Sequence, residues 1–94
     1  MKPTTSSGKS LDELRVEIEN ADRDILKLIQ KRIMIAEAIG HRKLARGKPT
    51  LVPEREAAVV RKAAELANEM GLPEEEIRKL MWILIGLSRK HQQG

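Results

Sequence analysis

The residue most suggestive of a binding or catalytic role is an arginine, at a position where the surrounding pattern places apolar side chains. Arg32 lies seven residues after Ile25 and seven before Ile39, so a heptad that turns both isoleucines inward also turns Arg32 inward. An unpaired cation in a protein interior costs several kcal/mol. Arg32 therefore needs a carboxylate or an anionic ligand, unless its long side chain reaches solvent; position alone does not choose between a structural ion pair and a bound anion.

Two further cations share this broad helix face. Lys43 lies eleven residues after Arg32, which is three helical turns or about 16 Å along the axis. Two long side chains at this spacing could hold the ends of a small molecule, although a lysine near a helix end is commonly just solvated. Arg15 lies about 25 Å from Arg32 along the same helix, too far to share a small pocket within one chain. In an antiparallel pair of chains, Arg15 of one copy could approach Arg32 of the other.

Other polar candidates lie near helix ends. Arg55 and Glu56 fall in the first turn of a predicted helix, where free backbone N–H groups favour anions. By position alone, Glu56 is typical of a surface acid that complements the helix dipole. Ser88 and Gln92, four residues apart, extend an apolar stripe with two hydrogen-bonding groups. Taken singly, each is typical of a solvated helix end.

Composition narrows the possible functions. The chain has 94 residues, no cysteine and a net charge of +4, and its single aromatic residue, Trp82, leaves no stacking surface for unpaired bases. We therefore expect no nucleic-acid binding, and the absence of a long apolar run predicts no membrane span. A chain without cysteine suits a reducing cytoplasm. There is no Ser/His/Asp grouping, metal-ligand cluster or glycine-rich phosphate loop, so an enzyme of this kind would use no metal and no cofactor.

Three helices must position these side chains. Ser10 and Glu13 form a capping-box pattern, and the apolar heptad that follows predicts a first helix over about residues 11–45. Proline at a first helical position predicts a second helix from residue 53, stopping at Gly71, and a third from Pro73. The expected inward positions are Leu11, Leu14, Ile18, Ala21, Ile25, Leu28, Ile35 and Ile39, then Ala57, Val60, Ala64 and Ala67, then Ile77, Leu80, Met81, Leu84 and Ile85.

The first predicted helix is too long for its own domain. At 1.5 Å per residue it measures roughly 50 Å, whereas a compact chain of this length is about 32 Å across. Two shorter helices cannot cover both ends of its apolar stripe, but a second copy can, so we expect a twofold homodimer. The prediction is an all-α domain over residues 11–94, preceded by a flexible N-terminal arm at residues 1–10, which are polar and rich in small residues.

Together these residues resemble the small all-helical class of chorismate mutases over about residues 11–92. The resemblance implies an intertwined homodimer of three-helix chains that converts chorismate to prephenate by a Claisen rearrangement, on the route to phenylalanine and tyrosine. The reaction needs neither cofactor nor metal. The motifs that carry the resemblance are Leu14-Arg15, Asp22, Leu28 to Arg32, Lys43, Pro53-Glu54-Arg55-Glu56, and Ser88 with Gln92.

The same resemblance implies which residues bind the two carboxylates of chorismate. Arg15 from the partner chain, with Arg32 and Arg55, would grip them and hold the reactive chair-like conformer. The sequence does not assign a particular carboxylate to a particular arginine. Ser88 would assist near the ring carboxylate.

The resemblance also implies the groups that face the reacting bond and the ring hydroxyl. Lys43 and Gln92 would hydrogen-bond the ether oxygen, where negative charge develops as its bond to carbon breaks. Glu56 would accept a hydrogen bond from the ring hydroxyl. The family usually has Asp or Asn four residues before this glutamate; here the residue is Val52, which offers only its backbone to the substrate.

Two other functions fit the same features. An isochorismate-pyruvate lyase on this fold would eliminate pyruvate from a related dianion. A non-catalytic dimeric helical interaction module would need Arg32 only as the partner of an aspartate or glutamate. Assays with chorismate and isochorismate distinguish a mutase from a lyase. Replacement of Arg32 distinguishes an enzyme from an interaction module, since a structural role affects stability and not turnover.

Overall fold

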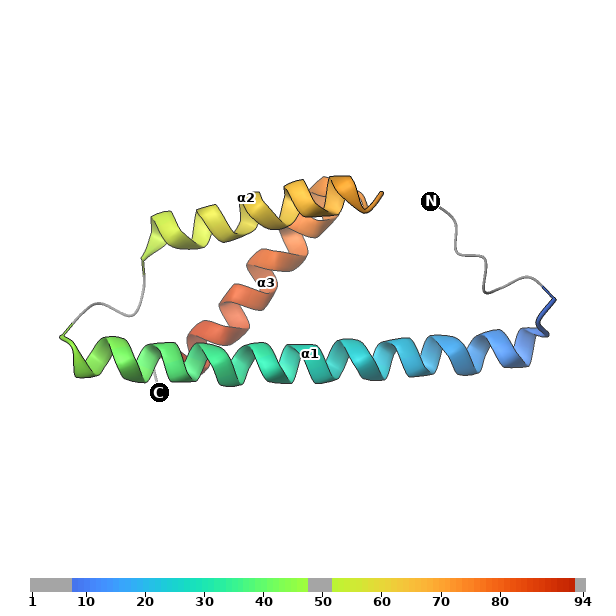
Figure 1. Cartoon of the computed structure of the whole chain (residues 1–94), viewed down its shortest axis with the longest axis horizontal. Helices are drawn as coiled ribbons and strands as arrows, with labels where there is room; N and C mark the ends of the chain where they lie inside the picture. Colours follow the sequence, from blue (N-terminus) through green and yellow to red (C-terminus); the bar gives the residue numbers. More distant parts are fainter. Residues whose placement is uncertain (1–7, 48–51, 93–94) are drawn as a thin grey trace.

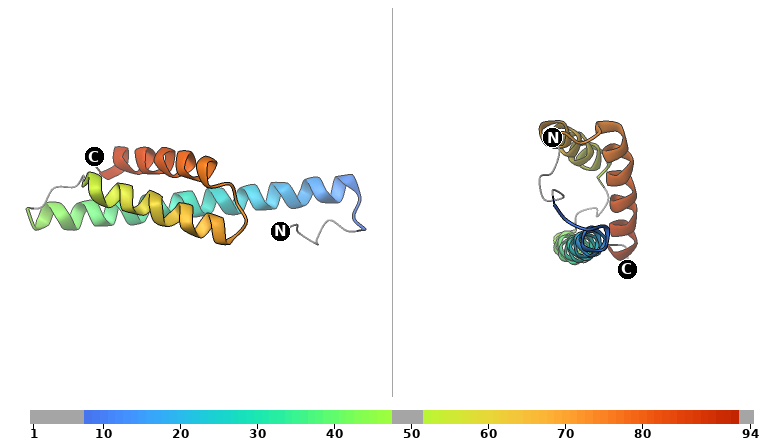
Figure 2. Two further views of the ribbon diagram at one scale, coloured as in Figure 1. Left: turned by 90° about the horizontal axis from the view of Figure 1, so that it is seen from above. Right: turned by 90° about the vertical axis from the view of Figure 1, so that its right-hand side faces the viewer.

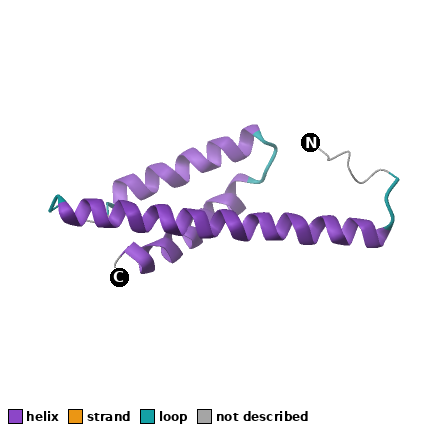
Figure 3. Cartoon of the chain, turned by 60° about the horizontal axis from the view of Figure 1, so that its bottom comes forward, coloured by secondary structure: helices purple, strands orange, loops and turns teal. Residues whose placement is uncertain are grey.

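The computed structural model describes residues 8–47 and 52–92, with side chains described for residues 8–47 and 52–90. Over these ranges the chain forms three helices and no strand, namely α1 (Leu11–Ala45), α2 (Pro53–Glu69) and α3 (Glu74–Gln92) (Figure 3). The predicted all-α class is therefore confirmed. Within those ranges, no helix is both long enough and apolar enough to cross a bilayer. Residues 1–7 of the predicted N-terminal arm lie outside the described residues.

The helix α1 begins at the predicted capping box. The backbone N–H of Glu13 donates to the Ser10 hydroxyl at 3.1 Å, and the backbone N–H of Ser10 donates to the Glu13 carboxylate at 2.9 Å. These bonds satisfy two backbone groups that helix geometry leaves unpaired, and the bond from the Ser10 N–H to the carboxylate lowers the pKa of Glu13. The helix then runs for 35 residues to Ala45, and Gly47 turns the chain with a φ of 69°. The predicted bounds of this helix are confirmed.

The two shorter helices agree with the prediction to within two residues. The helix α2 begins at Pro53, and its C-terminal turn includes Gly71, whose φ of 77° suits glycine. The helix α3 begins at Glu74, so Pro73 precedes the first helical position instead of occupying it. The Pro73 carbonyl accepts the first helical hydrogen bond, from the N–H of Ile77. A residue in this place needs no N–H partner of its own, which is why proline is tolerated there.

The helix α3 holds the other two helices together. In Figure 1, α2 lies above the C-terminal half of α1 and runs in the opposite direction, and α3 crosses from one to the other. The end-on view in Figure 2 shows the same arrangement, and among the described residues the backbones of α1 and α2 both contact α3 but not each other. The buried residues are mostly small: Ala36 and Gly40 on α1, and Val60, Ala64 and Ala67 on α2. Small side chains let the helices approach α3 closely.

The N-terminal half of α1 projects beyond the other helices (Figure 1). The molecule measures 57 × 23 × 15 Å, with a radius of gyration of 16.9 Å, against about 12 Å for a compact chain of this size. The apolar stripe of this half is not buried within one chain: Leu11, Ile18 and Leu28 are each more than 60% exposed. Leu80 on α3, also expected to face inward, is 48% exposed. The inward positions predicted on α2, by contrast, are buried or half-buried.

Candidate active site

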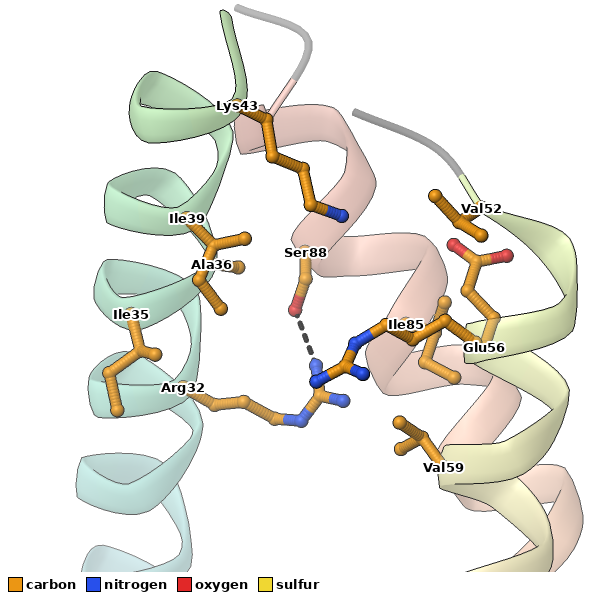
Figure 4. A pocket seen from close by; sticks show the side chains of 11 residues that line it. Arg32, Ile35, Ala36, Ile39, Lys43, Val52, Glu56, Val59, Ile85 and Ser88 are labelled. Atoms are coloured by element: carbon orange, nitrogen blue, oxygen red, sulfur yellow. Dashed lines mark hydrogen bonds between the residues drawn. The ribbon is translucent and has the colours of Figure 1, made fainter. Parts of the chain in front are cut away.

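A pocket of about 270 Å³ lies between α1 and α2, with α3 behind it (Figure 4). Its volume is near the lower end of the range for small-molecule sites, about 300–1,000 Å³. The lining carries three cationic side chains and one carboxylate in an otherwise largely apolar wall, which leaves a surplus of positive charge. The helix α1 contributes Arg32, Ile35, Ala36, Ile39 and Lys43 to the lining, and α3 contributes Ile85 and Ser88. The other lining residues are Val52, which directly precedes α2, and Arg55, Glu56 and Val59 within α2.

Arg32 is held in the pocket by a hydroxyl and not by a carboxylate. Its Nη1 donates to Oγ of Ser88 at 2.8 Å, and the Ser88 hydroxyl donates to the carbonyl oxygen of Leu84 at 2.9 Å. Ser88 is buried at 5% exposure, so this chain of hydrogen bonds has a fixed base on α3. None of the ion pairs among the described residues includes Arg32. The structural ion pair that the sequence left open is therefore not formed in this part of the chain.

Lys43 occupies the far end of the same pocket. Figure 4 shows its amine directed from α1 into the space in front of Ser88, toward the side where α2 begins. Its positive charge contributes to lowering the pKa of Glu56 across the pocket. The two cations predicted to share one face of α1 thus line one pocket, with Arg32 at one end and Lys43 at the other.

Glu56 is not the exposed surface acid that its position suggested, because its side chain is only 15% exposed and is paired. The guanidinium of Arg89, on α3, donates from Nε to Oε2 at 3.0 Å and from Nη2 to Oε1. The hydrogen bonds from Arg89 lower the pKa of Glu56, with further attraction from Arg89 and Lys43, while burial acts in the opposite direction. The carboxylate is therefore an ionised acceptor at neutral pH.

Arg89 was not identified from the sequence. It lies 33 residues from Glu56 along the chain, and the pair forms only because of the angle at which α3 crosses α2. The available signal was weak: Arg89 follows Ile85 by four residues and so continues the apolar face of the helix. This four-residue spacing alone does not distinguish a buried contact of Arg89 from a side chain exposed at a solvated helix end.

Three of the predicted site residues need separate description. Arg15 lies on the projecting half of α1, exposed and 3.8 Å from Asp12, so it is not part of this pocket within one chain. Val52 lines the pocket close to Glu56 and presents an apolar side chain there (Figure 4). Gln92 ends α3, but its side chain lies outside the described residues.

The arrangement suits the binding of a small dianion. It offers cationic donors at both ends of the pocket and one ionised acceptor, all on helices, which fits catalysis by positioning and electrostatics. Among the residues that the structure describes, no three histidine, cysteine, aspartate or glutamate side chains gather in a way that would hold a metal ion.

Known proteins show related sequences. The T-protein of Enterobacter agglomerans is 33% identical over 75 residues, which cover 76% of this chain and 20% of that protein. The intracellular chorismate mutase of Mycobacterium tuberculosis is 39% identical over 59 residues, covering 63% of this chain and 56% of that protein. The bifunctional chorismate mutase/prephenate dehydratase of Aquifex aeolicus is 39% identical over 62 residues, covering 66% of this chain and 17% of that protein.

The matched regions therefore represent only part of these relatives, from about a sixth to just over half of their length. No solved structure is significantly similar to the chain. The family described as chorismate mutase type II matches residues 14–93, which include α2 and α3 and nearly all of α1. The chain belongs to the chorismate mutase type II family.

Proposed function

We propose that this protein is a chorismate mutase, which rearranges chorismate to prephenate in the biosynthesis of phenylalanine and tyrosine. The observation that supports this most directly is the surplus of positive charge in the pocket, where Arg32, Lys43 and Arg55 surround one carboxylate that is already paired. Chorismate is a dianion with a ring hydroxyl and an ether oxygen, so it complements both the cations and the acceptor Glu56. The family and the names of the relatives support the same activity.

Binding of both carboxylates restrains the substrate. Arg32 and Arg55 bind them, with Arg32 oriented by Ser88, and this holds the side chain of chorismate over its ring in the chair-like reactive conformer. The arginines are preorganised by helices, so little reorganisation accompanies the reaction.

Electrostatic stabilisation acts at the breaking bond. Lys43 and Gln92 donate hydrogen bonds to the ether oxygen as negative charge develops there, and Glu56 accepts from the ring hydroxyl. A rate acceleration of about a million-fold corresponds to roughly 8 kcal/mol. Conformational restraint together with two donors at one oxygen is sufficient for this amount, and no proton transfer or covalent intermediate is needed.

The active unit in this proposal is an intertwined homodimer in which each pocket receives Arg15 from the partner chain. The exposed apolar stripe on the projecting half of α1 supports dimerisation, since burying it requires another surface. Arg15 lies beside this stripe, in a shallow hollow that it shares with Leu11, Leu14, Ile18 and Glu19. Association through the stripe would therefore bring a cation to the interface.

We also propose a cytoplasmic location. The relatives from mycobacteria carry the name intracellular chorismate mutase, and the chain contains no cysteine that could form a disulfide bond in an oxidising compartment.

The proposal is tested by incubating the purified protein with chorismate and following the loss of its absorbance together with the formation of prephenate. Isochorismate is assayed in parallel, with pyruvate as the product measured. We expect prephenate from chorismate as the main activity. Release of pyruvate from isochorismate without formation of prephenate would instead identify a lyase.

Replacement of Arg32 by alanine tests whether its charge serves catalysis. We expect Arg32→Ala to lower kcat/KM by about two to three orders of magnitude, because a preorganised donor to the substrate is lost. The matched control is Lys31→Ala, which removes an exposed cation from the next position of α1 and should leave kcat/KM unchanged. If the wild type shows no turnover and Arg32→Ala lowers the stability measured in a urea titration, the result would favour the interaction module.

Mixing two inactive variants tests the contribution of Arg15 from the partner. If Arg15→Ala and Arg32→Ala chains are unfolded together and refolded, half of the dimers are mixed and each mixed dimer keeps one intact pocket. We therefore expect about a quarter of the wild-type activity from an equal mixture, measured against each variant refolded alone. A mixture no more active than its components would contradict the shared site.

A further inference from the structure

Two consecutive residues of α3 hold opposite walls of the pocket. Ser88 accepts a hydrogen bond from Arg32 on α1, and Arg89 donates to both oxygens of Glu56 on α2. Successive residues of a helix point about 100° apart, so neighbours on α3 can reach the two helices that flank it. The contact of Ser88 lies within the site described above, whereas the contact of Arg89 has no assigned purpose.

Arg89 approaches Glu56 from outside the pocket. It is not among the pocket-lining residues, and its side chain is 41% exposed, whereas that of Glu56 is 15% exposed. The guanidinium thus covers the carboxylate on its solvent side without entering the space available to a ligand. Arg89 is therefore placed to act through Glu56 and not on the substrate itself.

The bidentate geometry leaves Glu56 able to accept another hydrogen bond. Each carboxylate oxygen has two lone pairs, and a guanidinium that donates to both oxygens uses one on each. The other lone pairs remain available. A glutamate without such a partner would move among several rotamers, so the fork of Arg89 fixes the direction in which the acceptor points.

We infer that Arg89 is a positioning residue, which grips both oxygens of Glu56 from outside the pocket and aims this carboxylate at the hydroxyl of the bound substrate. The role rests on the proposed function, in which Glu56 accepts a hydrogen bond from that hydroxyl. It gives α3 a further part in catalysis, because the same helix turn then orients the acceptor as well as the cation Arg32.

The surrounding charges determine the pH dependence of this arrangement. Besides Arg89 on α3, the other charged groups of the pocket are all cations. They are Arg32 and Lys43 on α1, and Arg55, which directly precedes Glu56 on α2. Arg89 contributes most to lowering the pKa of Glu56, and burial raises it. Without Arg89, the carboxylate should take up a proton at higher pH, so an activity that needs it ionised should fail earlier as the pH falls.

The experiment compares Arg89→Met with the wild-type enzyme. We expect kcat/KM for chorismate to fall by about tenfold, mainly through a higher KM because the hydroxyl contact exists in the bound substrate too. The acid limb of the kcat/KM profile should move to higher pH. Arg89→Lys should restore much of the pH profile but less of the affinity, since an ammonium keeps the charge without the fork. Lys90→Met, which removes an exposed cation from the next position, should match the wild type.

A second measurement does not depend on turnover. The carboxyl carbon of Glu56 is followed by nuclear magnetic resonance during a pH titration, and its pKa should be higher in Arg89→Met than in the wild type. If the wild type fails to convert chorismate, the proposed function fails, while this titration still shows whether Arg89 controls Glu56. The inference is overturned if Arg89→Met keeps the wild-type pH profile and kcat/KM, or if it is more active, since the pair would then withhold the acceptor.

Discussion

Arg32, half-buried in the pocket wall, is held by the neutral hydroxyl of Ser88, and no carboxylate among the described residues pairs with it. A hydroxyl fixes the direction of a guanidinium without neutralising it. With Lys43 and Arg55 in the same pocket, the positive charge remains available to a ligand, and the low polarity of the surrounding side chains strengthens its attraction for an anion. In the proposed function this uncompensated charge binds the substrate, and the rest of the fold maintains it.

The helix α3 is the element that maintains it. It contacts both neighbours, whose buried residues are mostly small, and among the described residues the backbones of α1 and α2 do not contact each other. A core of this kind buries little apolar surface. Much of the apolar stripe of α1 therefore stays exposed in the single chain. In the proposed homodimer, a second chain covers this stripe and supplies Arg15 to the pocket.

Local rules were enough to predict the helices. The capping box at Ser10 and the proline at residue 53 act within a single turn, so the starts of α1 and α2 follow directly from the sequence. Arg32 and Lys43 could be placed together because both lie on one helix. The pairing of Glu56 with Arg89 could not, since it depends on how α2 and α3 cross. Leu80 was misjudged because periodicity identifies an apolar stripe but not how much of its width a neighbour covers.

Calorimetry can show whether the cations of the pocket are matched to two negative charges on the ligand. A stable bicyclic dicarboxylate that imitates the chair-like transition state is titrated into the protein, and its monomethyl esters are titrated under the same conditions. Such matching predicts one bound dicarboxylate per pocket, with an affinity that salt weakens. Esterification of either carboxylate should weaken binding at least tenfold, or about 1.4 kcal/mol for each tenfold. Equal binding of the dicarboxylate and both esters would contradict it.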